Sequence, residues 1–367
     1  MGTLNRHFVR SLIDWIFRRR SPALLTMRFG LGCIALAFGA GWVLNMSIPF
    51  RDGQVDISFD SSGGTPIWLV YTAGLLGLGL MVFGLVWEVV RYRIEQKRLN
   101  RKKVVIIEVR GLRDASGTSL IKAIPTNLEG YRDHVLIDMR QGIKDGEIVE
   151  PEAVLRELIS LPTDLKRREN GVDRHDFTLV YGGLAPVPFT FLAGVLIDDE
   201  NTVRIFDWDR YAETWRQLDG SDDGKRFRGP MIDEISFDTP EVALAVSVSY
   251  GVSENDVRAK VGAIPFIAMN LEGGAPDCHW SEEKQRALGS QFLDTVIDLG
   301  NRRVKRIHLF LAAQNSICFR FGRLYDKRNL PEVVVYQYRK AEKPPYPWGV
   351  LMPVCGIDQP IIVGIGQ

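Results

Sequence analysis

The sequence predicts an α/β fold class: two transmembrane helices followed by a soluble domain of two similar α/β halves. Two observations lead to this prediction. Apolar stretches without a charged residue occupy 29–50 and 61–87, and each reaches the roughly 20 residues that a helix needs to cross a bilayer. Beyond these stretches, a pattern of strand, small-residue turn and helix occurs twice. We therefore divide the chain into a membrane module (1–103), a first half (104–235) and a second half (236–367).

The charges that flank the apolar stretches predict the membrane topology. We expect transmembrane helices at about 24–46 and 66–90, with basic residues on both outer flanks and a short, mainly acidic loop between them. By the positive-inside rule, both ends of the chain then lie in the cytoplasm. The residues expected to anchor the helices at the membrane interfaces are Arg28, Trp42, Trp68 and Trp87. A cleaved signal peptide is the alternative for the first stretch, and the equally apolar second stretch argues against it.

Two further features belong to the membrane module. Apolar residues at helical spacing, with arginines between them, predict an amphipathic helix on the inner membrane surface: Leu4, Phe8, Leu12, Trp15 and Ile16. Arg28 lies at the edge of the first span, and no charged residue lies within 29–50 or 61–87, which argues against a proton relay or a selective ion pathway.

Charge and cysteine content exclude several functions. Residues 1–103 carry 14 basic and 6 acidic side chains, whereas 104–367 carry 32 and 39. The soluble part therefore lacks the positive field that non-specific DNA or RNA binding requires. The four cysteines lack the paired spacing of a zinc site. Cytoplasmic location argues against disulfides.

We find no motif that predicts catalysis or metal binding. There is no Gly-x-Ser-x-Gly elbow, no phosphate loop ending in Gly-Lys-Ser/Thr and no His-Glu-x-x-His. His308 lies within an apolar strand and is expected to be a core residue, and Cys278-His279-Trp280 has no second pair of ligands nearby. The acidic segment 219–224 is expected to be a solvated turn, because Pro230 occupies the position of a calcium-binding glutamate. We expect no enzyme activity, cofactor or metal.

The two halves can be aligned over one strand, turn and helix. The first copy contains Thr178-Leu-Val-Tyr-Gly-Gly-Leu-Ala-Pro, Phe189 and Gly194, and the second contains Ile307-His-Leu-Phe-Leu-Ala-Ala-Gln-Asn, Phe319 and Gly322. A β-rich strand follows in each half, at 203–208 and 333–338. This geometry places the N–H groups of a helix N-terminus beyond the carboxyl end of a parallel strand, where open α/β sheets bind ligands and anions are favoured.

These segments carry a family resemblance. Arg306-Ile-His-Leu-Phe-Leu-Ala-Ala, Phe321-Gly-Arg and Leu330-Pro-Glu-Val-Val-Val-Tyr resemble the closing signature of the SAVED domain, and Leu179-Val-Tyr-Gly-Gly-Leu-Ala-Pro-Val-Pro-Phe is similar to its upstream part. The whole layout resembles the transmembrane SAVED effectors of bacterial CBASS antiphage defence. The resemblance implies two fused CARF-like Rossmannoid halves, a multi-pass location in the bacterial inner membrane, and a cyclic oligonucleotide ligand made by a cognate nucleotidyltransferase. An adenine-containing cyclic trinucleotide is the ligand that the resemblance favours.

The residues expected to bind this ligand lie at strand ends and in the segments that follow: Arg110, Arg113, Gly182, Gly183, Leu184, Tyr250, Ser253, Trp280, Gln314, Asn315, Ser316, Arg323, Tyr325 and Lys327. Cations among them would bind phosphates, aromatic rings would stack on bases, and the two amides would read base edges. Ligand binding would drive homo-oligomerisation, clustering of the transmembrane helices and membrane disruption that kills the cell. A membrane-tethered cyclic-oligonucleotide nuclease, and a receptor that signals to a separate partner, remain as alternatives.

Overall fold

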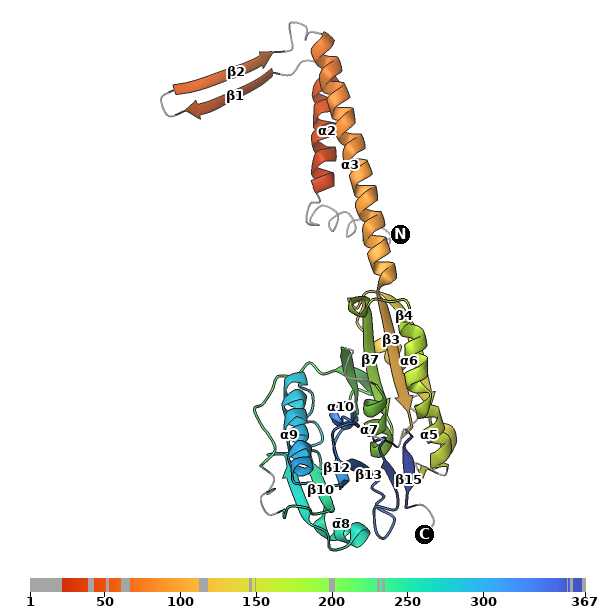
Figure 1. The fold of residues 1–367 in the computed structure, drawn as a ribbon. Coiled ribbons are helices and arrows are strands. Elements are labelled where there is room, and N and C mark those ends of the chain that lie inside the picture. Colours follow the sequence, from red (N-terminus) through yellow and green to blue (C-terminus); the bar gives the residue numbers. More distant parts are fainter. Residues whose placement is uncertain are drawn as a thin grey trace. The chain divides into compact units, whose positions relative to one another are not determined.

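The computed structural model describes residues 22–38, 43–50, 53–60, 67–111, 118–144, 147–148, 150–197, 202–229, 232, 235–354, 356 and 359–364 (Figure 1). The chain divides into two compact units, Met1–Leu99 and Asn100–Gln367. The expected N-terminal amphipathic helix, Trp42 and Arg113 lie outside the described residues.

The first unit contains two apolar helices. Helix α2 (Pro22–Phe38) has 17 residues and α3 (Ile67–Arg101) has 35, which correspond to about 26 Å and 52 Å at 1.5 Å per residue. Among the described residues, one helical segment is long and apolar enough to cross a membrane, Val70–Lys97 in α3, and α2 contributes the shorter apolar stretch Pro22–Ala35. The two helices pack closely, since a Cβ at Gly30 would lie 2.6 Å from the Gly77 carbonyl oxygen.

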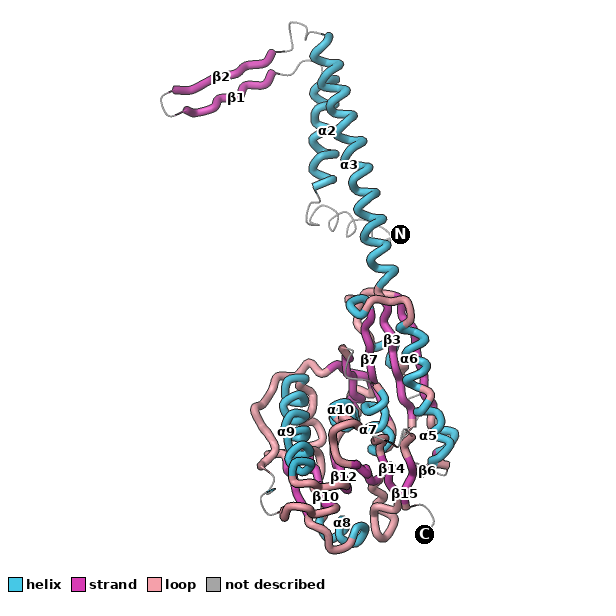
Figure 2. The backbone as a smooth tube through the Cα atoms, viewed as in Figure 1, coloured by secondary structure: helices cyan, strands magenta, loops and turns pink. Residues whose placement is uncertain are grey.

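The prediction of a helix over 24–46 is wrong at its C-terminal end, from Val43 onward. Helix α2 ends at Phe38, and strands β1 (Val43–Phe50) and β2 (Gly53–Asp60) form an antiparallel ribbon where we expected the end of a helix and a loop (Figure 2). From Leu44 to Ile48, and again from Gln54 to Asp60, apolar and polar residues alternate with the period of a strand. Pro49 also lacks the N–H that a helix interior requires.

The second unit contains two sheets with the same strand order. The first is β4-β3-β7-β8-β9, formed by Tyr131–Asp138, Lys103–Arg110, Phe177–Leu184, Val203–Asp209 and Thr214–Gln217. The second is β11-β10-β12-β13-β14-β15, formed by Phe266–Asn270, Glu241–Ser247, Arg306–Ala312, Glu332–Tyr336, Gly349–Leu351 and Ile361–Val363. In each sheet the first four strands are parallel and the next is antiparallel. The order 2-1-3-4-5 is that of doubly wound Rossmann-like domains, so the predicted repeat of two Rossmannoid halves is confirmed.

Helices connect and cover these strands. They are α4 (Leu120–Ala123), α5 (Pro151–Ile159), α6 (Leu161–Glu169), α7 (Val187–Leu196), α8 (Glu254–Val261), α9 (Glu282–Asn301) and α10 (Asn315–Leu324). Short 3₁₀ turns at Arg140–Gly142 and Arg174–Asp176 and the small hairpin of β5 (Ile143–Lys144) and β6 (Glu147–Ile148) complete the described elements. Helices α8 and α9 begin where Ser253 and Ser281 accept hydrogen bonds from Asp256 N and Lys284 N, as N-cap serines commonly do.

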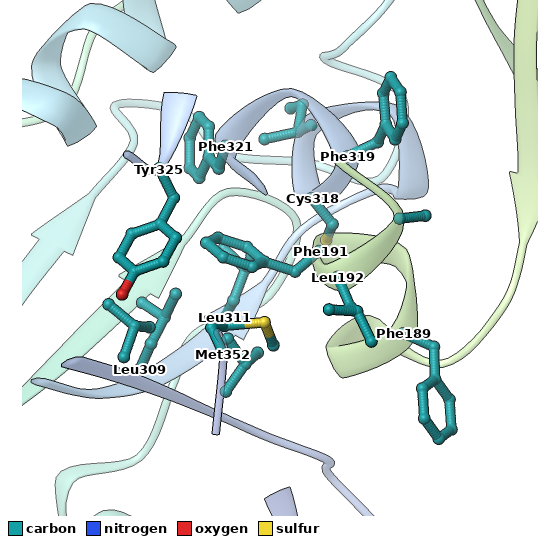
Figure 3. Packing of buried hydrophobic residues seen from close by; sticks show 14 of the residues in the cluster. Phe189, Phe191, Leu192, Leu309, Leu311, Cys318, Phe319, Phe321, Tyr325 and Met352 are labelled. Carbon is teal, nitrogen blue, oxygen red and sulfur yellow. The ribbon is translucent and has the colours of Figure 1, made fainter. Parts of the chain in front are cut away.

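A crossing of α7 and α10 joins the two halves. Helix α7 belongs to the first half but contacts β13 and β14, whereas α10 belongs to the second half and contacts β7 and β8. One buried apolar cluster therefore runs through both sheets, with Phe191, Phe319 and Phe321 near its centre (Figure 3). A Cβ at Gly194 would overlap the Phe319 carbonyl oxygen, and one at Gly322 would overlap the Phe191 carbonyl oxygen. Only glycine permits this backbone approach.

The crossing also corrects the alignment of the two halves. Phe191 and Phe319 each lie three residues before the glycine of the crossing, so the sequence match of Phe189 with Phe319 is wrong by two residues. Neighbouring hydrogen bonds agree with the new register, because Thr190 Oγ1 donates to Ala185 O and Cys318 Sγ donates to Ala313 O.

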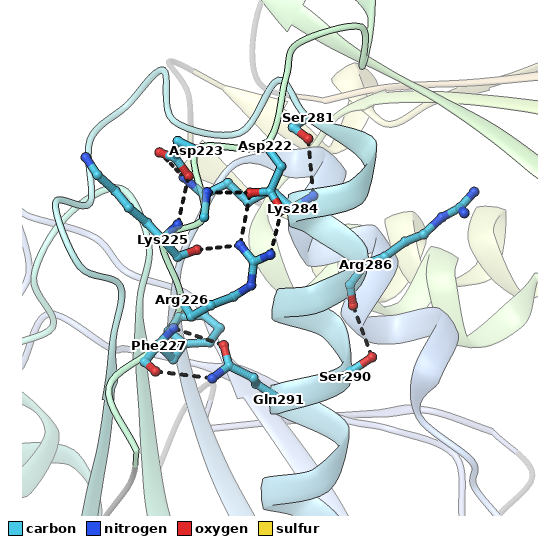
Figure 4. Close-up of polar contacts among 11 residues, drawn as sticks. Asp222, Asp223, Lys225, Arg226, Phe227, Ser281, Lys284, Arg286, Ser290 and Gln291 are labelled. Carbon is cyan, nitrogen blue, oxygen red and sulfur yellow. Dashed lines mark hydrogen bonds and ion pairs between the residues drawn. The ribbon is translucent and has the colours of Figure 1, made fainter.

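The segment between the halves is anchored on α9. Buried Lys284 donates to Asp223 Oδ2 at 2.9 Å, and Arg226 pairs with Asp222 (Figure 4). The Gln291 amide accepts from Phe227 N and donates to Phe227 O. Most residues of 219–224 are exposed, as expected for a solvated turn, and the ion pairs of Asp222 and Asp223 tie the segment to Arg226 and α9. Within the described part of the chain, no group of three potential metal ligands is present.

Candidate ligand-binding site

Each sheet has a switch point between the two strands that are first and third in chain order within that half, at their carboxyl ends. In the first half these strands are β3 and β7, which end side by side with Arg110 opposite Leu184. In the second half they are β10 and β12, which end with Ser247 opposite Ala312. Doubly wound sheets bind their ligands at this position. The predicted residues Arg110, Gly182–Leu184 and Gln314–Ser316 lie at these two ends.

In the first half, Arg110 is held by a buried carboxylate. Glu108 is fully buried on β3, and its oxygens accept from Arg110 Nε at 2.7 Å, Ser119 Oγ at 2.8 Å and Leu120 N at 3.1 Å. His134 Nε2 lies 3.0 Å away. Burial by itself would raise the pKa of Glu108, but the hydrogen bonds from His134, Ser119 and Arg110 outweigh it and hold the pKa at about 2. The carboxylate stays ionised and orients the guanidinium.

The neighbouring glycines serve packing. Gly182 and Gly183 are buried, and Leu184 is half-buried. The Leu184 carbonyl accepts from Gly111 N at 2.7 Å, which keeps the ends of β3 and β7 together.

In the second half, the start of α10 is held by residues of the first. Asp207 of β8 accepts from Ser316 N at 3.0 Å, and Thr190 Oγ1 of α7 donates to Asn315 Oδ1 at 2.9 Å. Gln285 Nε2 donates to Ser316 Oγ, and Gln314 Nε2 donates to the carbonyls of Ala275 and Pro276. These contacts bring the two switch points together across the α7–α10 crossing.

Neither helix N-terminus is an open anion site, contrary to our expectation. At α10, Asp207 already occupies the Ser316 N–H. At α7, the second residue is Pro188, which has no N–H to donate. A bound anion would need side chains at the strand ends instead.

Two predicted aromatic residues differ in exposure. Tyr250 follows β10 and is 61% exposed, so a face of its ring is open to a ligand. Trp280 is half-buried, with the Arg216 guanidinium 4.7 Å from its ring centroid and the His279 ring 4.3 Å away. His279 itself is buried with Nε2 3.5 Å from Asp207 Oδ2, and burial lowers its pKa despite that carboxylate. Ser253 is exposed, and its hydroxyl caps α8.

The structure separates three predicted residues from the rest. Arg323, Tyr325 and Lys327 lie at or beyond the last turn of α10, about 15 Å along the helix from its start. Tyr325 is buried and donates to Pro331 O at 3.1 Å, and burial raises the pKa of its hydroxyl. Lys327 lines an open pocket of about 880 Å³ together with Ile297 and Leu330.

Of the residues predicted to anchor the helices at the membrane interfaces, Arg28, Trp68 and Trp87 are exposed on α2 and α3. The side chains that sequence reasoning missed are Glu108, Asp207 and His279. Glu108 had a recognisable signal, since it is the single charge within the apolar run 104–109.

Comparison with known families identifies the second unit. Residues 161–352 match the SAVED family, described as a SMODS-associated and fused to various effectors sensor domain. The chain belongs to the SAVED family. Residues 1–155 match the family described as a SAVED-fused 2TM effector domain. The family and the fold class expected from the sequence are therefore confirmed.

The chain also matches solved structures of SAVED/CARF-domain receptors at low identity. The Cap4 receptor of Acinetobacter baumannii with the cyclic trinucleotide 2'3'3'-cAAA is 11% identical, with a TM-score of 0.44, over 78% of this chain and 59% of that one. The same receptor with 3'3'3'-cAAA is 9% identical, with a TM-score of 0.43 and the same coverage. The Cap4 receptor of Moraxella osloensis is 9% identical, with a TM-score of 0.42, over 77% of this chain and 56% of that one. The chain thus matches less than two thirds of each receptor's length. Among curated proteins, the comparison found no match.

Proposed function

We propose that the chain is a cyclic-oligonucleotide-gated membrane effector of bacterial antiphage defence. Its SAVED domain would bind an adenine-containing cyclic trinucleotide, assemble into homo-oligomers and thereby cluster the membrane helices until the inner membrane loses integrity. The observation that carries this proposal is the pair of switch points, one in each half, joined by the Thr190–Asn315 hydrogen bond across the α7–α10 crossing. A cyclic ligand of repeated units suits a site of two similar halves.

The described side chains at the strand ends supply suitable chemistry. Arg110 retains a partly exposed guanidinium that Glu108 orients, and a guanidinium is a good partner for phosphate. Tyr250 offers an exposed ring, and stacking of a base on such a ring contributes about 1–3 kcal/mol. The amides of Gln314 and Asn315 stand at the start of α10, where a base edge could be read.

The membrane unit supports a multi-pass arrangement with both ends in the cytoplasm. Helix α2, at about 26 Å, is at the short limit for a span, and α3 exceeds it. The basic residues after Val90 and the acidic residues between 51 and 60 agree with this orientation. Large apolar side chains of α3, such as Leu75 and Phe83, are exposed, as contact with lipid or with other copies would require.

A ligand titration with a matched pair of tyrosine variants tests this function. The full chain in liposomes would be mixed with 2'3'3'-cAAA, 3'3'3'-cAAA and cyclic dinucleotides, while heat of binding and dye leakage are followed. We expect one trinucleotide to bind and to trigger leakage. Tyr250→Ala should weaken binding about tenfold, the equivalent of roughly 1.4 kcal/mol. Tyr131→Ala should leave it unchanged, because Tyr131 is 69% exposed at the opposite, amino-terminal edge of its sheet.

The outcomes separate the proposals. Binding without leakage would contradict the effector and favour a receptor that signals to a partner. Loss of intact ligand during incubation would favour a nuclease. Equal losses from Tyr250→Ala and Tyr131→Ala would contradict the assignment of the strand ends as the site.

A further inference from the structure

The ribbon of β1 and β2 separates its apolar and polar residues by face. Directly opposite residues of an antiparallel pair lie on the same face, and successive residues alternate between faces. One face contains the register pairs Leu44–Phe59, Met46–Ile57 and Ile48–Val55. The other contains Asn45–Ser58, Ser47–Asp56 and Pro49–Gln54. The ribbon is therefore amphipathic.

An amphipathic ribbon of two strands needs a cover for its apolar face. Within the described residues, β1 and β2 pair only with each other. A two-stranded hairpin is marginally stable in water by itself. Removing apolar surface from water contributes about 25 cal/mol per Å², so the ribbon gains stability from any apolar phase within reach.

The chain limits where that cover can be. Four residues separate the end of α2 at Phe38 from the start of β1, and six separate the end of β2 from the start of α3 at Ile67. Fully extended, these connections of five and seven Cα–Cα steps reach at most about 18 Å and 25 Å. Val43 and Asp60 pair with each other, so both connections attach to the same end of the ribbon. If α2 and α3 cross the bilayer, that end is held close to the outer surface of the inner membrane.

We propose that the apolar face of this ribbon lies in the outer leaflet of the inner membrane, near the headgroups and against lipid acyl chains, while the polar face contacts water. This inference rests on the proposed membrane function. The two strands contain no Lys or Arg, and Asp56 and Asp60 are acidic. Attraction to anionic headgroups therefore contributes nothing, and because such headgroups repel the two aspartates, we expect the ribbon to enter neutral lipid more readily than anionic lipid.

Adjacent positions on opposite faces provide a test with built-in controls. The full chain, with Cys33, Cys278, Cys318 and Cys355 replaced by Ala and its binding of cyclic trinucleotide checked, would receive single cysteines by Phe59→Cys, Ser58→Cys, Leu44→Cys or Asn45→Cys. Each cysteine would carry an environment-sensitive fluorophore, and the protein would be placed in phosphatidylcholine vesicles. We expect blue-shifted emission that nitroxide-labelled lipid quenches at 59 and 44, and water-like emission at 58 and 45.

Three results would overturn the proposal. Water-like emission at all four positions would mean that the ribbon stands clear of the bilayer. Blue-shifted emission at all four would mean that it is embedded on both faces. A shift at 59 and 44 that depends on protein density, and that lipid nitroxides do not quench, would identify a second copy as the cover.

A label introduced by Leu75→Cys on α3 separates this inference from the function beneath it. Lipid quenching at 75 with a water-like ribbon would overturn the ribbon proposal alone. Water-like emission at 75 would overturn the membrane function and the ribbon proposal with it.

Discussion

Replacing Gly322 by alanine should destabilise the whole SAVED unit, because it acts on the crossing that joins the halves. The new Cβ would overlap the Phe191 carbonyl oxygen, with the carbonyl carbon at 2.8 Å and Cα at 3.1 Å. These are backbone atoms of α7 and cannot rotate aside. Overpacking of a core costs typically 1–3 kcal/mol, and here we expect the upper end of that range. The better helix propensity of alanine returns about 1 kcal/mol, which leaves a net loss of about 2 kcal/mol.

Thermal unfolding of the full chain in detergent, followed by near-ultraviolet circular dichroism, measures this loss. A loss of 2 kcal/mol should lower the Tm by roughly 4–8 °C for a unit of this size. Gly289→Ala in α9 is the matched control, because its Cβ would meet only side-chain atoms, the flexible end of Leu324 and the Arg320 side chain at ordinary contact distance. If Gly322→Ala and Gly289→Ala unfold at the same temperature, the close crossing of α7 and α10 is refuted.

Two further predictions concern buried charges of the SAVED unit. The pKa of Glu108 is about 2 in the folded protein against an ordinary value of 4.5, so its contribution is complete above pH 4.5 and is lost as the pH falls toward 2. Glu108→Gln should remove roughly 3 kcal/mol from the pH dependence of the free energy of unfolding. Urea unfolding between pH 6 and about pH 2.5 would measure this, and parallel pH curves for variant and wild type would contradict it. Asp223→Asn leaves the buried Lys284 ammonium without its carboxylate and should cost about 1–2 kcal/mol at pH 7. The exposed Asp219→Asn should stay within about 0.5 kcal/mol, and equal urea midpoints for these two variants would disprove the role of Asp223.

Much of the fold could be predicted because it follows from local patterns. The apolar run 104–109 is typical of a central parallel strand covered on both faces, and its counterpart 242–246 behaves in the same way. The glycines at 194 and 322 marked the repeat correctly. The ribbon at 43–60 was missed because an uncharged stretch satisfies the length criterion for a transmembrane helix even when its alternation favours strands.

The candidate site was predictable in its location but less so in its side chains. Arg110 and Tyr250 could be placed at strand ends from the sequence, because the carboxyl ends of parallel strands are common to all such sheets. Asp207 could not, since its importance depends on contact with Ser316, 109 residues later in the chain. Tyr325 lies only ten residues after Asn315 in the sequence, but in the structure the length of α10 separates it from the strand ends.

From the sequence alone, one can predict an apolar helix at α3 long enough to cross a membrane, the alternation of strands and helices, and the duplication of the SAVED halves. Each of these depends on the periodicity or length of a single segment. The tertiary structure alone shows that α7 packs against the second sheet and α10 against the first, that Asp207 accepts from the Ser316 N–H, and that Glu108 orients Arg110. Those features depend on which distant segments share one core. Neither close packing of backbones nor a buried charge leaves a periodic signal along the chain.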